Sequence, residues 1–202
     1  MATAHHPTRE KLIETTARLL ETMSRSELSS ELILKESGIS KGSLYHHFQD
    51  LDHVIESAML RRYTDWVDQS ISAMTYILTT GKNAQEIYDA LTQVTERTQN
   101  PAMRSERIYR AEVILMADRS PRFAKELGIE QQRLTDALTD LIREVQEIGY
   151  YKKDYDPQAI AVFIQAYTLG RVVDDFSETP INPDNWNYLI NSVIKKVFST
   201  LE

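Results

Sequence analysis

Residues 29–48 read SSELILKESGISKGSLYHHF, and this stretch decides the fold of the N-terminal part of the chain. Ser29 is a good N-cap for a short helix, and Gly38 stands where a left-handed residue commonly ends one. Ser40 is a second N-cap, for a helix over residues 41–48. Two short helices joined by a glycine turn are typical of a helix-turn-helix, whose second helix enters the major groove of DNA.

The second of these helices has an apolar side and a polar side. At about 100° per residue, Leu44 and Phe48 fall together and should pack inward. The opposite face carries small or hydrogen-bonding groups and no acidic residue. We expect Gly42 to let the helix N-terminus approach a phosphate, which the free N–H groups and the helix dipole favour. Ser43 and His46 can form hydrogen bonds with base edges.

The other polar side chains around this face can reach phosphate oxygens. The candidate DNA-binding residues are Ser29, Lys41, Gly42, Ser43, Tyr45, His46 and His47. Residues 1–50 hold six Lys and Arg against seven Asp and Glu, a formal charge of −1. Long-range attraction to DNA is therefore weak, and we expect the loss of any single contact to be costly.

The histidines also raise a second interpretation, a metal site. It would combine His46, His47 and His53 with Asp50 or Asp52. Adjacent side chains on a helix point about 100° apart, which is a poor geometry for chelation. We therefore expect neither a metal ion nor a cofactor.

The composition excludes several other classes of protein. The 202 residues contain no cysteine, which excludes disulfides, zinc ribbons, iron–sulfur ligation and thiol catalysis. No apolar run approaches the roughly 18 residues of a membrane span, and no signal peptide is visible, so we expect a cytoplasmic protein without a membrane partner. The net charge of −7 argues against non-specific nucleic-acid binding but permits one small DNA-reading face.

Hydrophobic spacing predicts helices nearly everywhere. The expected helices are one from Thr8, those at residues 29–37 and 41–48, one from Asp50 to Gly81, and then 83–99, 102–117, 120–148 with a break allowed at Gly128, 156–175, and a last one from Asn182. The fold class is therefore all-α with about nine helices. We expect a three-helix helix-turn-helix DNA-binding domain over residues 1–50, and a helical-bundle domain for ligand binding and dimerisation over residues 51–202.

The segment GISKGSLYHHF, residues 38–48, resembles the signature of the TetR family of transcriptional repressors. The resemblance is dense over residues 8–60, and beyond them only the helical architecture is similar. It implies that the seven candidate residues lie at positions that usually contact operator DNA, with Tyr45 and Ser29 mostly on phosphates. It also implies core positions for the apolar residues of the second helix.

The sequence departs from the family pattern at three positions. Leu51 stands where many members have a lysine, which removes one expected phosphate contact. Leu34 replaces a common alanine, and Ser30 replaces an apolar residue. These changes imply a somewhat different packing angle between the two short helices.

The C-terminal domain carries no sequence signature, but its last two helices are unusually apolar. In the helix at 156–175, only Gln165 and Thr168 interrupt the apolar run of residues 159–169. They are candidate functional polar groups, with hydrogen bonding across a subunit interface as the alternative. Arg171 with Asp174 and Asp175 should form a solvated ion-pair cluster. A two-fold symmetric dimer would cover both apolar helices.

Aromatic and methionine side chains are the candidates for a ligand pocket in this domain, because a Tyr or Trp ring offers a flat wall with a polar tip. They are Tyr63, Trp66, Tyr88, Tyr109, Met116, Phe163 and Tyr167.

The sequence thus predicts a homodimeric repressor with two heads about 34–36 Å apart on a palindromic, double-stranded operator. A small-molecule effector would lower its DNA affinity. A regulator controlled by a protein partner, or one that activates, stays open as an alternative. An enzyme is not expected, because a helical di-iron centre needs Glu-x-x-His pairs and the chain has none.

Overall fold

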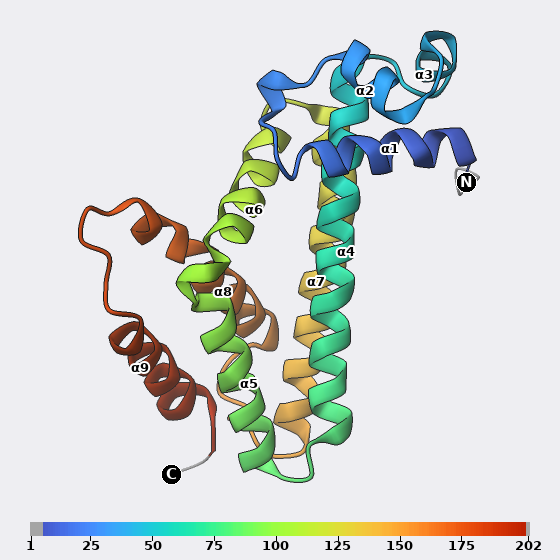
Figure 1. Cartoon of the computed structure of the whole chain (residues 1–202). Coiled ribbons are helices and arrows are strands. Elements are labelled where there is room, and N and C mark those ends of the chain that lie inside the picture. Colours follow the sequence, from blue (N-terminus) through green and yellow to red (C-terminus); the bar gives the residue numbers. More distant parts are fainter. Residues whose placement is uncertain (1–5, 201–202) are drawn as a thin grey trace. The chain divides into compact units, whose positions relative to one another are not determined.

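The computed structural model describes residues 6–200, and all nine α-helices in that range agree with the all-α prediction (Figure 1). The helices are α1 Pro7–Leu19, α2 Ser30–Ser37, α3 Lys41–His47, α4 Leu51–Thr80, α5 Ala84–Gln99, α6 Arg104–Ala117, α7 Pro121–Glu147, α8 Pro157–Gly170 and α9 Pro183–Val193. Short helical turns η1 Arg25–Glu27, η2 Pro101–Met103, η3 Arg171–Phe176 and η4 Ile194–Phe198 join or extend them. Over the same residues, no helix is long and apolar enough to cross a lipid bilayer.

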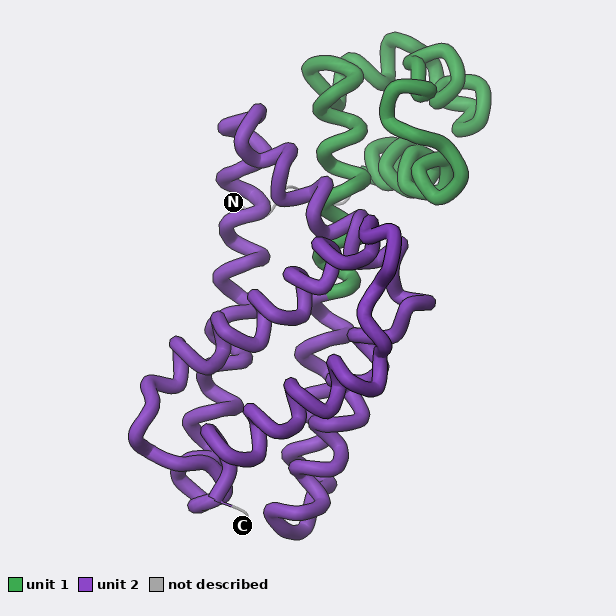
Figure 2. Tube along the Cα trace, turned by 90° about the vertical axis from the view of Figure 1, so that its left-hand side faces the viewer, with its two compact units in different colours: residues 1–66 green, residues 67–202 purple. Residues whose placement is uncertain are grey.

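The chain forms two compact units that divide at residue 66, inside α4 (Figure 2). Residues 51–66 of α4 belong to the N-terminal unit, and residues 67–80 belong to the C-terminal unit. The division lies beyond the seam expected near residue 50, because Val54 and Ala58 of α4 are part of the N-terminal core. The functional boundary between residues 1–50 and 51–202 remains a prediction.

The core of the N-terminal unit joins all of its helices. α1, α2 and α3 contribute side chains to it, as does α4, and its buried members are Leu12, Ile13, Ile33, Leu44, Phe48, Val54 and Ala58. Leu44 is 0% exposed and Phe48 is 2% exposed. Burial of a side chain of this size stabilises the fold by about 1.5–3 kcal/mol. The apolar side of α3 is therefore fixed against the rest of the unit.

Local capping sets where the short helices begin and end. The Oγ atom of Ser29 accepts a hydrogen bond from the Leu32 amide at 3.2 Å, and the Ser40 Oγ atom accepts one from the Ser43 amide at 3.2 Å. Gly38 ends α2 with a φ of 67°, in the left-handed region that favours glycine. The turn and both caps lie where the sequence predicts them.

The C-terminal unit is built around the long helix α7. Leu141, Ile142 and Val145 of α7 share a buried cluster with residues of α8, α9 and η4. α7 passes through Gly128 without a break, because buried side chains on both sides of the glycine hold the helix, Phe123 and Leu127 before it among them. The expected helix over residues 156–175 changes instead from α8 into the tighter turn η3 at Arg171.

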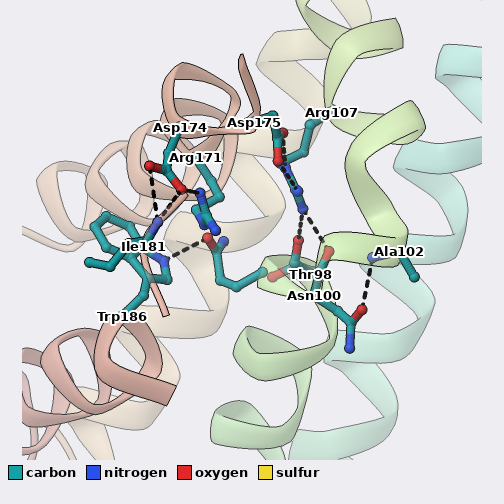
Figure 3. A network of polar contacts seen from close by, with 10 residues as sticks. Thr98, Asn100, Ala102, Arg107, Arg171, Asp174, Asp175, Ile181 and Trp186 are labelled. Atoms are coloured by element: carbon teal, nitrogen blue, oxygen red, sulfur yellow. Dashed lines mark hydrogen bonds and ion pairs between the residues drawn. The ribbon is translucent and has the colours of Figure 1, made fainter. Parts of the chain in front are cut away.

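A buried ion pair links α5, α6 and η3 (Figure 3). Arg107 donates two hydrogen bonds to Asp175, at 2.7 and 2.6 Å, and two more to the backbone oxygens of Thr98 and Asn100 at 3.0 Å. The side chains of Arg107 and Asp175 are 0% and 5% exposed. These hydrogen bonds hold the pKa of Asp175 below its ordinary value, against the effect of burial. The expectation of a solvated cluster around Asp175 is wrong, because the arginines reach inward to carbonyl and carboxylate acceptors.

Replacing Gly38 with alanine should destabilise the N-terminal unit by about 1 kcal/mol, because the added Cβ is strained at a φ of 67°. Gly42→Ala is the matched control. Gly42 lies in α3 without a positive φ, and a Cβ there meets no atom within 4 Å, so alanine should stabilise by about 0.5–1 kcal/mol. Urea unfolding followed by circular dichroism measures both. Equal effects of the two substitutions would contradict the left-handed turn.

Candidate nucleic-acid interface

The structure turns the polar side of α3 to solvent. Lys41, Gly42 and His46 are exposed, and Ser43 and His47 are half-buried. A helix with its apolar side buried and a continuous polar side exposed has the arrangement that groove reading requires.

Hydrogen bonds fix the hydroxyl groups at the start of α3. The Ser43 Oγ atom lies 3.0 Å from the Ser40 Oγ atom, so the two serines hold one another in place. Each hydroxyl keeps capacity for a further hydrogen bond, because an O–H donates once and accepts twice. Ser40 was not among the sequence candidates, although its place as the N-cap was evident.

Tyr45 lies beside the start of α2. Its ring is 46% exposed, and its Oη atom lies 3.5 Å from the Ser30 Oγ atom. Ser29, the residue before Ser30, is half-buried and uses its Oγ atom as the α2 cap. The structure thus places Tyr45 next to Ser29 and Ser30. The sequence analysis treated Ser30 only as a departure from the family pattern.

Three imidazole rings lie together at the end of α3. The His47 ring centre lies 4.4 Å from that of His6 and 5.0 Å from that of His46. Partial burial lowers the pKa of His47, and the nearby charges of His6, His46 and Arg9 lower it further. These effects favour the neutral form of the His47 imidazole. Sequence reasoning missed His6 and Arg9, because only the packing of α1 brings them to α3.

The geometry does not support the alternative of a metal site. The Nδ1 atom of His53 accepts a hydrogen bond from the Gln49 amide at 3.2 Å, and its ring packs edge-on against Phe48. His53 thus uses its Nδ1 atom within the turn and packs its ring against Phe48. Between residues 6 and 200, no group of three or more His, Cys, Asp or Glu side chains is placed to hold a metal ion.

The seven candidate pocket residues fall into separate groups. Tyr63 and Trp66 pack together in the N-terminal unit, with ring centres 5.4 Å apart. In the C-terminal unit, Phe163 and Tyr167 are in ring contact at 5.5 Å. Tyr88 and Tyr167 both pack against the cluster around α7, which brings these two candidates to one core.

Two further candidates lie on α6. Tyr109 and Met116 are 9% and 8% exposed, so both are buried in their helix packing. A groove of about 270 Å³ in the C-terminal unit runs between α4 and α7 and contains none of the seven candidates. Its walls are formed by Ile71, Met74, Thr75, Leu78, Thr79, Ala137, Asp140, Leu141 and Glu144. A pocket lined by the predicted residues therefore remains a prediction.

The two polar residues of α8 find their partners within the chain. Gln165 donates to the Thr135 hydroxyl of α7 at 3.1 Å and accepts from Gln131. Thr168 donates to the Ile164 carbonyl at 2.6 Å. Neither side chain needs a second subunit for its hydrogen bonds.

The N-terminal residues are similar to a described family of bacterial proteins. Residues 12–58 match the family profile "Bacterial regulatory proteins, tetR family". The chain is also 26% identical, over 170 residues, to the HTH-type transcriptional repressor KstR2 of Mycobacterium tuberculosis, covering 79% of this chain and 77% of that protein.

Solved structures share the fold of the whole chain. A protein from Mesorhizobium loti assigned to the TetR family of transcriptional regulators aligns with a TM-score of 0.72 at 14% identity, over 96% of this chain and 98% of its own. A transcriptional regulator from Saccharomonospora viridis in complex with choline gives a TM-score of 0.70 at 19% identity, with the same coverage. KstR2 of Mycobacterium tuberculosis gives 0.54 at 20% identity, over 98% of this chain and 97% of its own.

Replacing His6 with glutamine should raise the pKa of His47 toward the ordinary value of 6.5, because it removes the largest of the neighbouring repulsions. His46→Gln removes a weaker repulsion and should give a smaller rise. Proton NMR titration of the imidazole signals measures both. A His47 that titrates at or above 6.5 in the unchanged protein would contradict the proximity of the three rings.

Proposed function

We infer that this chain, a member of the TetR family of transcriptional regulators, is a repressor that binds a palindromic operator as a homodimer and is released by a small molecule. The observation that carries the proposal is α3, with Leu44 and Phe48 buried and its polar side exposed. The fold is that of a DNA-binding regulator. The likeness to a repressor over 79% of the chain supports repression rather than activation. A bacterial operator lies in the cytoplasm, so we place the protein there.

The proposed DNA contacts divide into two kinds. Ser43 and His46 project from the middle of the polar side and are assigned to base edges, which they can reach with donors and acceptors. Lys41, Tyr45 and Ser29 lie toward the margins and are assigned to phosphate oxygens. His47 is also assigned to phosphate oxygens, as a hydrogen-bond donor that gains charge as the pH falls. Gly42, without a side chain, permits close approach of the DNA backbone.

An exposed apolar surface on α8 and α9 supports the dimer. Ala159, Val162, Phe163 and Ala166 of α8 recur at helical spacing and are all exposed. On α9, Tyr188 is 75% exposed and Leu189 is 52% exposed; the two apolar groups together form what we call the α8–α9 face. Exposed apolar groups at helical spacing are typical of an interaction site, and a two-fold axis would pack two such faces into a four-helix arrangement.

Release by a ligand needs only a difference in affinity between two conformations of the protein. A ligand that prefers the conformation with lower DNA affinity by about 2–3 kcal/mol weakens operator binding about 30- to 150-fold. α4 is the element that we assign to transmit this preference, because it contributes residues to both compact units. The choline bound to the Saccharomonospora viridis regulator supports a small-molecule site in this fold.

Gel-shift titration with a duplex selected from random sequence tests the DNA contacts. Lys41→Ala and Tyr45→Phe should weaken binding on all sequences, and Lys41→Ala should reduce the salt slope by about 1. Ser43→Ala and His46→Ala should change which sequence is preferred, at a cost of about 1–3 kcal/mol on the selected one. Lys125→Ala, an exposed lysine of the other unit, is the control and should bind like the unchanged protein. If all four variants bind like the control, the assignment of α3 to the groove is wrong.

Light scattering tests the dimer, which should have twice the chain mass of 23.3 kDa. Val162→Asp should give monomers, because it places a charge in the centre of the α8–α9 face. Leu115→Asp changes an apolar residue of α6 that is also exposed, and it should leave the mass unchanged. A Val162→Asp protein that stays dimeric would exclude this face as the interface.

A further inference from the structure

Two buried polar side chains, from α5 and η3, lie beside a partly buried tryptophan of α9 in the C-terminal unit, on one side of the network in Figure 3. Trp186 of α9 donates its indole Nε1–H to the Oε1 atom of Gln99, the last residue of α5, at 2.8 Å. The guanidinium carbon of Arg171 lies 6.0 Å from the centre of the Trp186 ring. Gln99 is 1% exposed and Arg171 is 4% exposed. A single indole thus brings a buried amide and a buried cation together.

Both of these side chains have a buried N–H group without an acceptor. The Nε2 atom of Gln99 and the Nε atom of Arg171 have no hydrogen-bond partner among residues 6–200. Arg171 uses Nη1 to bind Asp174, which leaves the Nε edge of its guanidinium free. Buried donors are almost always satisfied in folded proteins, and an unsatisfied charged donor is especially costly. Since both atoms donate, only an acceptor satisfies them.

The surrounding charges favour an acceptor that is an anion. Arg104, Arg107 and Arg171 all act on the carboxylate of Asp175. In the hydrogen-bond network that residues 6–200 form here, Arg171 pairs with Asp174 and Arg107 with Asp175, so two carboxylates face three guanidinium groups. A carboxylate supplies two oxygens, which suits one guanidinium edge and one neighbouring amide. A neutral carbonyl oxygen can also accept two hydrogen bonds, but it adds no negative charge opposite the three arginines.

The group is accessible from one side. The connection from η3 to α9, residues 177–182, is exposed along its whole length. Its attachment to this group is the Ile181 amide, which donates to Asp174 at 3.0 and 3.3 Å. The Asp174 side chain is itself 27% exposed. The exposed segment 177–182 is therefore the side from which we expect a small molecule to approach Arg171.

We propose that Arg171 and Gln99 form a binding site for the carboxylate of a small organic effector, next to the indole of Trp186. The assignment of the ligand as an effector rests on the proposed regulatory function. Binding of the carboxylate does not rest on that function, because the site lies within one compact unit and binding can be measured without DNA. In this site Arg171 supplies charge and geometry, Gln99 adds a second donor, and Trp186 holds the amide of Gln99 in place.

Tryptophan fluorescence reports directly on this site. The chain has two tryptophans, so a Trp66→Phe protein leaves Trp186 as its single reporter. Titration with sodium acetate at constant ionic strength, kept with sodium fluoride, should change the Trp186 emission in a saturable way. Acetamide, which has the same shape without the charge, should not. Arg171→Gln in the same background should weaken acetate binding at least ten-fold, whereas Arg119→Gln, at an exposed arginine outside the network, should not.

Gln99→Glu keeps the proposal testable if Arg171→Gln fails to fold. The new carboxylate can still accept from Trp186 and places an acceptor beside the Nε edge of Arg171. It should therefore raise the thermal midpoint of the ligand-free protein and abolish the acetate response. Equal responses to acetate and acetamide, or a Gln99→Glu protein that still binds acetate like the parent, would overturn the site.

The two proposals fail in different ways. A protein that binds acetate but no operator duplex would overturn the regulatory function and leave the site intact. A protein that binds its duplex but shows no saturable acetate response would overturn the site alone. Carboxylate binding that leaves the gel-shift affinity unchanged would overturn the assignment of the ligand as an effector.

Discussion

The burial of Leu44 and Phe48 is the constraint on which the N-terminal unit depends. α3 has seven residues, too few to be stable as an isolated helix. Its direction is set by two side chains that enter a core shared with α1, α2 and α4. Once these are fixed, helical geometry leaves no freedom for the opposite side, which must face solvent. The surface that we propose to read DNA is therefore a consequence of the core.

The C-terminal unit contains a buried, hydrogen-bonded ion pair. Arg107 ties the end of α5 to η3 through four hydrogen bonds, and it is fully buried. Removing one partner of such a pair typically costs about 3–5 kcal/mol, because the other charge is left uncompensated. The same framework positions Arg171 and Gln99, each of which has a donor without a partner in the part of the chain that the structure describes. A selective ligand site requires donors that are held in place by the fold and are free to bind a ligand.

Much of the fold could be predicted, because its signals are local. Ser29, Gly38 and Ser40 each act within four residues of their own position, so capping and turn chemistry locate α2 and α3 from sequence alone. Features that depend on contacts between distant residues could not be predicted in this way. The approach of His6 to His47 spans 41 positions, and the pairing of Arg107 with Asp175 spans 68. Helical spacing does not encode either contact.

The C-terminal unit shows the same limit in its aromatic residues. Helical spacing shows that Tyr88 and Tyr167 face inward, but not which of the inward-facing rings gather in one place. Gly128 illustrates the opposite error. A glycine within a helix costs about 1 kcal/mol by itself, which the burial of neighbouring side chains of α7 outweighs. Propensity alone therefore suggested a break that tertiary packing removes.

Hydrogen–deuterium exchange with and without a selected operator duplex tests the central claim most directly. We predict slower exchange over α3 and the start of α2 when the duplex is added, because the polar side of α3 then lies against DNA. The α8–α9 face should exchange at the same rate in both states. Protection of other segments with an unchanged rate over residues 41–47 would contradict the claim that α3 reads the DNA.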